Sequence, residues 1–196
     1  MPDLSLTPVM DAQGLEFFRS AIARSKVVLE YGCGGSTAYA ANVAGVESII
    51  SVDTSKEWVD KVKAALAGTQ SHVHLTHCDV GDIGDWGKPL NMNRARQFWR
   101  YMVLPWDVAK SRNLVPDLIL VDGRFRVASF LYSALCARVG TLILFDDYLD
   151  RPEYFVVEKF CRLTERHGRM GVFCVDHTYS LPDLVAAIAE YSVLCD

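Results

Sequence analysis

The 196-residue sequence lacks any uninterrupted run of the roughly 18–20 apolar residues that a membrane-spanning helix needs. It also begins without the basic start and apolar block of a secretion signal. Its six cysteines are widely scattered and include no Cys-x-x-Cys pair, which argues against both a zinc ribbon and a disulfide framework. These absences predict a cytoplasmic protein with no membrane partner.

The sequence also lacks a large excess of either positive or negative charge. The 20 basic and 24 acidic residues leave a formal net charge of -4, which makes nucleic acid an unlikely partner because a general nucleic-acid binder carries a basic field. Internal repeats and linkers rich in Gly, Ser or Pro are also missing, and hydrophobic residues make up 51% of the chain. The composition predicts one globular domain over residues 1–196, and a homo-oligomer remains an open alternative.

What the sequence does contain is an alternation of short apolar runs with longer helix-like stretches. The expected strands are 27–31, 48–52, 72–77, 117–121, 141–145 and 170–175. The expected helices are 11–24, 36–44, 55–67, 127–139, 153–168 and 181–194. Strands that are apolar on both faces favour a mostly parallel sheet with helices on both faces. The fold class predicted is therefore a single Rossmann-like, doubly wound α/β domain with six or seven strands, the seventh being unplaced because the stretch after Val175 resembles a helix.

Residues 81–112 interrupt this alternation. The segment is long and rich in Trp, Arg and Asn, which predicts a partly helical insertion near the ligand-binding edge of the sheet. Its tryptophans, Trp86, Trp99 and Trp106, either pack within the insertion or form the wall of an acceptor pocket. Three histidines at 72, 74 and 77 lie on an expected strand, where the third points away from the first two, so a zinc site is disfavoured.

Glycine and acidic residues stand where the expected strands end. The run Glu30-Tyr31-Gly32-Cys33-Gly34-Gly35-Ser36 follows the first strand, and Asp53, Asp79 and Asp122 follow the next three. In open α/β sheets, ligands bind beyond the carboxyl ends of the strands. Residues without a Cβ allow a tight turn and close approach of a ligand, and a carboxylate such as Asp53 can accept hydrogen bonds from both ribose hydroxyls.

The glycine spacing does not fit a dinucleotide. The third glycine of the Gly-x-Gly-x-x-Gly pattern is replaced by Thr37, and Glu30 would repel a pyrophosphate while favouring a cationic amino-acid group. No phosphate-binding Gly-x-x-x-x-Gly-Lys-Ser/Thr motif occurs. A cofactor with ribose and adenine but without phosphates therefore fits best.

Four stretches, LEYGCGGSTAYAA, SVDTSKEW, HCDVGD and DLILVDGRFR, resemble the successive motifs of class I S-adenosylmethionine-dependent methyltransferases. The resemblance covers about Val27 to Tyr148. It implies that Glu30 and the glycine turn hold the methionine part of S-adenosylmethionine, that Asp53 holds the ribose, and that Asp79 and Val80 face the adenine. The cofactor-binding residues predicted are Glu30, Gly32, Cys33, Gly34, Gly35, Ser36, Asp53, Thr54, Asp79 and Val80.

Asp122 and the pair Asp146-Asp147 end neighbouring expected strands and should converge. Carboxylates placed together repel one another unless a proton or a cation intervenes, and oxygen ligands suit Mg²⁺, Mn²⁺ or Ca²⁺. The layout is similar to metal-dependent O-methyltransferases of the catechol and caffeoyl-coenzyme A type. It departs from them because Asp147 stands where Asn is usual and no lysine follows Asp122 in the usual place.

Three interpretations of these acids stay open: a metal site formed by Asp122, Asp146 and Asp147, a metal-free catalytic role for Asp122 and Asp147, and a structural role in which Arg124 or Arg126 neutralises Asp122. The function predicted is methyl transfer, with a small molecule or sugar accepting the methyl group on a hydroxyl oxygen. The alternatives are a non-catalytic module that binds an adenosyl ligand and a nicotinamide-dependent reductase.

Overall fold

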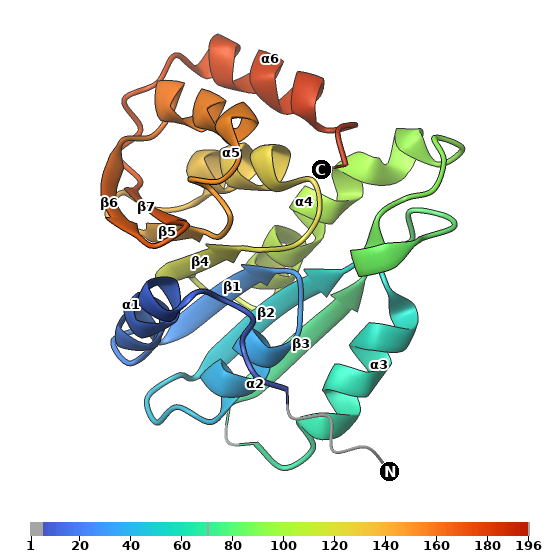
Figure 1. The fold of residues 1–196 in the computed structure, drawn as a ribbon, viewed down its shortest axis with the longest axis vertical. Helices are drawn as coiled ribbons and strands as arrows, with labels where there is room; N and C mark the ends of the chain where they lie inside the picture. Colours follow the sequence, from blue (N-terminus) through green and yellow to red (C-terminus); the bar gives the residue numbers. More distant parts are fainter. Residues whose placement is uncertain (1–5, 70, 196) are drawn as a thin grey trace.

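The computed structural model describes residues 6–69 and 71–195, and a seven-stranded sheet runs through their centre (Figure 1). The strands lie in the order β3-β2-β1-β4-β5-β7-β6; the first five are parallel, and β7 is antiparallel to both of its neighbours. This confirms the predicted fold class. Their bounds are β1 Val27–Tyr31, β2 Ser48–Asp53, β3 His72–His77, β4 Leu118–Val121, β5 Leu142–Phe145, β6 Leu163–His167 and β7 Met170–Cys174.

Helices cover both faces of the sheet. In Figure 1, α1, α2 and α3 lie on one side and α4, α5 and α6 on the other, each side enclosing its own apolar core. The helices are α1 Ala12–Ile22, α2 Gly35–Ala41, α3 Lys56–Ala65, α4 Ala95–Ser111, α5 Arg126–Cys136 and α6 Leu181–Tyr191. None of the helices in the described part of the chain has the length and apolar character needed to cross a membrane.

The helix predicted over residues 153–168 is wrong, because the chain forms a strand that reverses direction at Gly168. Residues 153–168 were expected to form a single helix, but the structure has the short 3₁₀ segment η2, Pro152–Lys159, followed by strand β6. Gly168 adopts the left-handed conformation with φ +58°, so that β6 pairs with β7 in a tight hairpin. Pairing with β7 outweighs the helical preference of the Glu and Arg residues in this stretch. The strand that the sequence left unplaced is therefore β6, which comes just before β7 in the chain. The stretch after Val175 contains the helix α6, as expected.

The segment 81–112 contains two elements of different kinds. Its second half is α4, which connects β3 to β4, packs against β2 and α5, and buries Phe98, Tyr101 and Met102. Its first half holds the 3₁₀ turn η1, Asp85–Gly87, which is anchored to the sheet because the Thr54 hydroxyl donates to the Gly87 carbonyl at 2.7 Å. The part of this segment that stands outside the helical layers is therefore 81–94, next to the carboxyl end of β2.

Candidate active site

The turn between β1 and α2 requires glycine because three backbones meet there. Gly32 has φ +91°, and a Cβ at this position would lie 2.8 Å from the Gly123 Cα after β4. A Cβ on Gly35 would lie 2.1 Å from the carbonyl carbon of Thr7 in the N-terminal segment. The predicted glycine turn therefore lies at the carboxyl edge of the sheet, in direct contact with the loop that carries Asp122.

Glu30 stabilises this turn by accepting hydrogen bonds from three side-chain hydroxyl groups. Its buried carboxylate accepts hydrogen bonds from Ser36, from Thr37 at 2.5 Å and from Ser51 at 2.9 Å. Burial raises the pKa of Glu30 to about 7. The Gly34 N–H also donates to the Thr37 hydroxyl at 2.8 Å, so the threonine at the position of the third glycine has a structural task. The predicted contact of Glu30 with a cofactor remains a prediction, since hydroxyls surround both oxygens.

Asp53 lies against the same turn at the end of β2. One carboxylate oxygen accepts the Cys33 N–H at 3.2 Å and the other accepts the Ser55 N–H at 2.9 Å. Burial raises the pKa of Asp53, while these N–H groups favour the charged form. Trp58 of α3, a residue not singled out in the sequence, adds a bond from its indole N–H to the Cys33 carbonyl at 2.6 Å. The acid and the glycine turn thus form one unit, as the strand-end pattern predicts.

Asp79 and Val80 follow β3 on the outer side of the site. Val80 is buried, whereas Asp79 is half-exposed and forms an ion pair with Arg94. The second Asp79 oxygen accepts the Gly81 N–H at 3.0 Å. An adenine at this position would meet the Val80 backbone beside a carboxylate that already has two partners.

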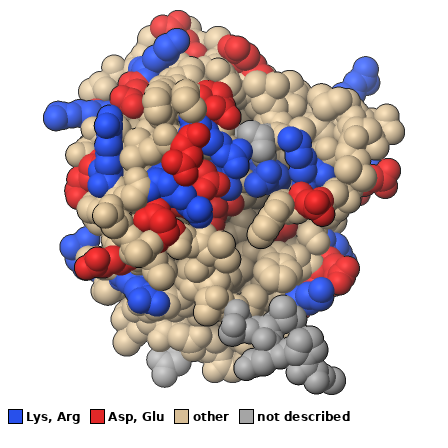
Figure 2. Space-filling view, viewed as in Figure 1, with Lys and Arg blue, Asp and Glu red and all other residues tan. Residues whose placement is uncertain are grey.

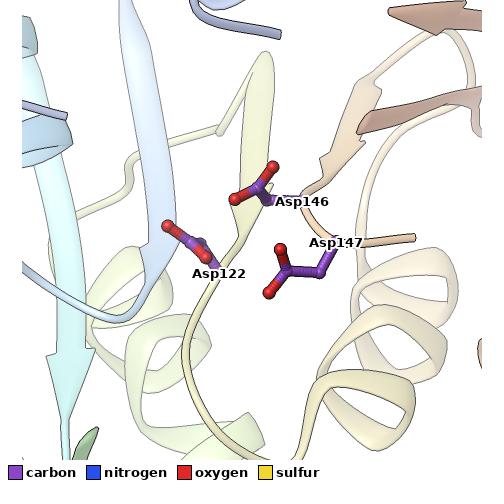
Figure 3. Close-up of side chains that lie close together, drawn as sticks. All are labelled: Asp122, Asp146 and Asp147. Carbon is purple, nitrogen blue, oxygen red and sulfur yellow. The ribbon is translucent and has the colours of Figure 1, made fainter. Parts of the chain in front are cut away.

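The acids after β4 and β5 converge as expected. Figure 3 shows Asp122, Asp146 and Asp147 together, and one oxygen from each lies within 4.8 Å of the others. Asp147 has φ +58°, a conformation that is uncommon for a residue with a side chain and that marks local strain. Burial raises the pKa of Asp122, and the neighbouring charges of Asp146 and Asp147 raise it further.

Two arginines hold all three acids. Arg126, almost fully buried at the start of α5, lies 3.2 Å from Asp122 and 2.9 Å from Asp147. Arg169, between β6 and β7, binds both oxygens of Asp146 at 3.1 and 2.8 Å and lies 3.0 Å from Asp147. Arg126 is one of the two residues predicted to neutralise Asp122. Arg169 was missed, because no local pattern connects it to a residue more than twenty positions earlier.

The surroundings of these acids do not fit a divalent cation. Guanidinium nitrogens of Arg126 and Arg169 lie about 3 Å from every carboxylate, and one of Arg151 lies 3.7 Å from Asp147. Three positive charges therefore offset the three negative ones, and a metal ion would be repelled by them. Charged side chains of both signs also interleave across the centre of the face shown in Figure 2. The acids therefore form an ion-pair network in which arginine takes the place expected for a metal.

Tyr101 of α4 is a further site residue that the sequence did not reveal. Its buried hydroxyl accepts the Arg124 N–H at 3.3 Å and lies 3.4 Å from the Val52 carbonyl, between the glycine turn and the Asp122 loop. The tryptophans differ from the pocket-wall interpretation. Trp106 is half-buried against the core and its indole N–H donates to the Tyr31 hydroxyl at 3.1 Å, whereas Trp86 and Trp99 are 84% and 50% exposed.

A seven-stranded sheet in this order, with a glycine turn after β1 and an acid after β2, defines a methyltransferase-like α/β protein. The chain is 31% identical to a methyltransferase-like protein from Silicibacter pomeroyi, with a TM-score of 0.89 over 97% of this chain and 99% of that one. It therefore belongs to the class I S-adenosylmethionine-dependent methyltransferases. No family model and no curated protein matches the sequence.

More distant structures share the fold alone. A methyltransferase from Geobacter sulfurreducens is 14% identical, with a TM-score of 0.55 over 85% of this chain and 80% of that chain. The N-methyltransferase NodS from Bradyrhizobium japonicum, solved in complex with S-adenosyl-L-homocysteine, is 10% identical, with a TM-score of 0.50 over 84% and 89%. Proteins of very different sequence therefore share this arrangement of sheet and helices.

Proposed function

We propose that the protein binds S-adenosylmethionine at the glycine turn. The observation that carries this proposal is the contact between Asp53 and the Cys33 N–H, because a partly exposed carboxylate that can accept ribose hydroxyls then lies beside the glycine turn. The backbone at Gly34 would lie beside the methionine part, since a Cβ there would meet no atom nearer than Trp58 at 3.7 Å, and the Val80 backbone would face the adenine. The complex of NodS with S-adenosyl-L-homocysteine supports the same class of ligand.

The reaction proposed is methyl transfer to a hydroxyl oxygen of a small molecule or sugar. S-adenosylmethionine supplies a methyl group whose leaving group is a neutral sulfide. As the acceptor oxygen forms its bond to the methyl carbon and the carbon–sulfur bond breaks, the hydroxyl proton passes to Asp122. Burial and the charges of Asp146 and Asp147 favour proton uptake by this carboxyl, and its ion pair with Arg126 holds it in place while favouring the charged form.

We propose that this transfer needs no divalent cation, since Arg126, Arg151 and Arg169 already compensate the three acids. With a panel of hydroxylated acceptors, turnover should persist after exhaustive chelation. Activity that disappears on chelation and returns with Mg²⁺ would restore the metal-dependent mechanism.

A second candidate is an adenosyl-binding protein that performs no transfer. The ion pairs that occupy all three acids favour it, because a general base must be released to accept a proton. A nicotinamide-dependent reductase is disfavoured by Thr37, whose side chain fills the position where a dinucleotide site needs glycine.

Titration calorimetry of the purified protein with S-adenosylmethionine, S-adenosylhomocysteine and NAD separates these candidates. We expect both adenosyl ligands to bind and NAD to show no heat beyond dilution. Binding of NAD alone would overturn the proposal. Binding of the adenosyl ligands without turnover across the acceptor panel would favour the non-catalytic candidate.

A further inference from the structure

Strand β3 forms an open edge of the sheet, because no strand of the described residues lies on its outer side. The His72 N–H donates to the Glu47 carbonyl at 2.9 Å and the Cys78 N–H to the Asp53 carbonyl at 2.8 Å, so the even-numbered residues bond toward β2. In a parallel pair the intervening residues face the other way. The N–H and C=O groups of Val73 and Leu75 therefore point to the open edge.

A groove of about 560 Å³ runs along this edge between the carboxyl-terminal ends of α3 and α4. Leu66, directly after α3, and Val108 of α4 supply apolar surface on the two sides of β3. Its volume lies within the range of roughly 300–1,000 Å³ that is typical of ligand sites. A strand edge at the base of an open groove is the geometry that an extended peptide occupies when it adds to a sheet.

The groove is positively charged. Lys63 lies on the α3 side and Arg112 on the α4 side, together with His72 and His74 of the strand. Among the described residues that line the groove, none is acidic, and neither Lys63 nor Arg112 forms an ion pair within the described part of the chain. Burial and the charge of Arg112 both lower the pKa of His74, consistent with this positive field.

We propose that the β3 edge binds an acidic segment of a partner protein, which adds to the sheet as an extended strand. Its backbone pairs with Val73 and Leu75. Neighbouring side chains of a strand point to opposite faces, so two consecutive acidic residues reach Lys63 on one side and Arg112 on the other. A second copy of this chain fits less well, because pairing two β3 edges would bring the same cations together.

The test uses three dye-labelled peptides of eight residues in fluorescence anisotropy. The first has a central Glu-Glu pair flanked by Val and Thr, the second has Gln-Gln instead, and the third is the Glu-Glu peptide with alternate backbone amides N-methylated. We expect the Glu-Glu peptide to bind, the Gln-Gln peptide to bind about tenfold more weakly, and the N-methylated peptide to lose binding. In amide NMR, Val73 and Leu75 should become protected from exchange.

Variants provide the matching control. Lys63→Glu and Arg112→Glu should each weaken binding about tenfold, whereas Lys110→Glu, an exposed α4 lysine outside the groove, should leave it unchanged. Equal affinity for the Glu-Glu and Gln-Gln peptides, or binding without protection of the two amides, would overturn the proposal. So would equal binding of free glutamate, which indicates a small-anion site, or self-association that Lys63→Glu abolishes.

Discussion

Glu30 and Asp53 are neighbouring acids on adjacent strands, but their surroundings assign them different tasks. Three hydroxyl groups donate to the buried Glu30 carboxylate and tie it to the turn. Asp53 is partly exposed and accepts one N–H on each oxygen, which leaves lone pairs for a ligand. At the scale of single residues, the contacts of Glu30 stabilise the turn, and those of Asp53 are compatible with the proposed ribose contact.

Glu30→Gln should change how stability depends on pH. The pKa of Glu30 rises from 4.5 to about 7 in the folded protein, so the folded state binds the proton more tightly. Its contribution to stability is therefore present below about pH 4.5 and is lost as the pH rises through about 7, a change on the order of 3 kcal/mol. Urea unfolding at about pH 5 and about pH 8 should show the wild type losing stability relative to Glu30→Gln.

The exposed Glu190 of α6 supplies the control, since Glu190→Gln should follow the wild type at both pH values. A constant difference between Glu30→Gln and the wild type across the range would contradict the raised pKa.

Asp53→Asn should weaken the binding of S-adenosylhomocysteine while leaving the fold intact. The amide keeps the shape but loses the charge that strengthens bonds from ribose hydroxyls, so we expect a loss of affinity of about 10- to 100-fold. Calorimetry measures the effect, and circular dichroism checks the fold. Asp60→Asn on the exposed face of α3 is the matched control. Unchanged affinity in Asp53→Asn would remove this acid from the site.

At the scale of elements, the site is a contact between two strand-to-helix turns. The β1–α2 turn and the β4–α5 turn touch at Gly32 and Gly123, and Tyr101 of α4 fills the space beside them. Residues of three crossovers, those that contain α2, α4 and α5, therefore meet at one point. The spacing between the glycine turn and Asp122 follows from this close packing.

Gly123→Ala should destabilise the protein by about 1–3 kcal/mol through overpacking. The new Cβ would lie 2.1 Å from the Tyr101 hydroxyl and 2.7 Å from the Gly32 nitrogen. In a Tyr101→Phe background the substitution should cost less, because the clash with the hydroxyl disappears while those with the backbone of Gly32 and Tyr31 remain. A double-mutant cycle in urea measures the difference. Identical costs in both backgrounds would show that Tyr101 does not limit the turn.

At the scale of the whole molecule, Arg169 joins parts of the chain that are distant in sequence. Its guanidinium binds Asp146 after β5 and the Val9 carbonyl at 2.9 Å, and its N–H donates to Asp11, the residue that caps α1. The hairpin, the N-terminal segment and the acid network are thereby held as one body. The positions of the acids therefore depend on the hairpin and the N-terminal segment as well as on the strands that carry them.

Arg169→Met should lower the free energy of unfolding by about 3–5 kcal/mol, because it leaves the fully buried Asp146 carboxylate without its cation. Adding Asp146→Asn should recover part of this loss, since the uncompensated charge is then removed. Arg138→Met, at an exposed arginine after α5, is the control and should have little effect. Chemical denaturation of the four proteins measures these differences, and an Arg169→Met variant as stable as the wild type would contradict the argument.

The sequence by itself determined the parallel part of the sheet, the glycine turn and the convergence of the acids. Buried strands show as apolar runs, and the carboxyl ends of parallel strands share one edge, so residues such as Asp53 and Asp122 must meet there. Only the tertiary structure decided the place of β6, the packing of Tyr101 beside the Gly32 and Gly123 turns, and the pairing of Asp146 with Arg169. These depend on contacts between residues far apart in the chain, which leave no periodic pattern and which override local helical preference.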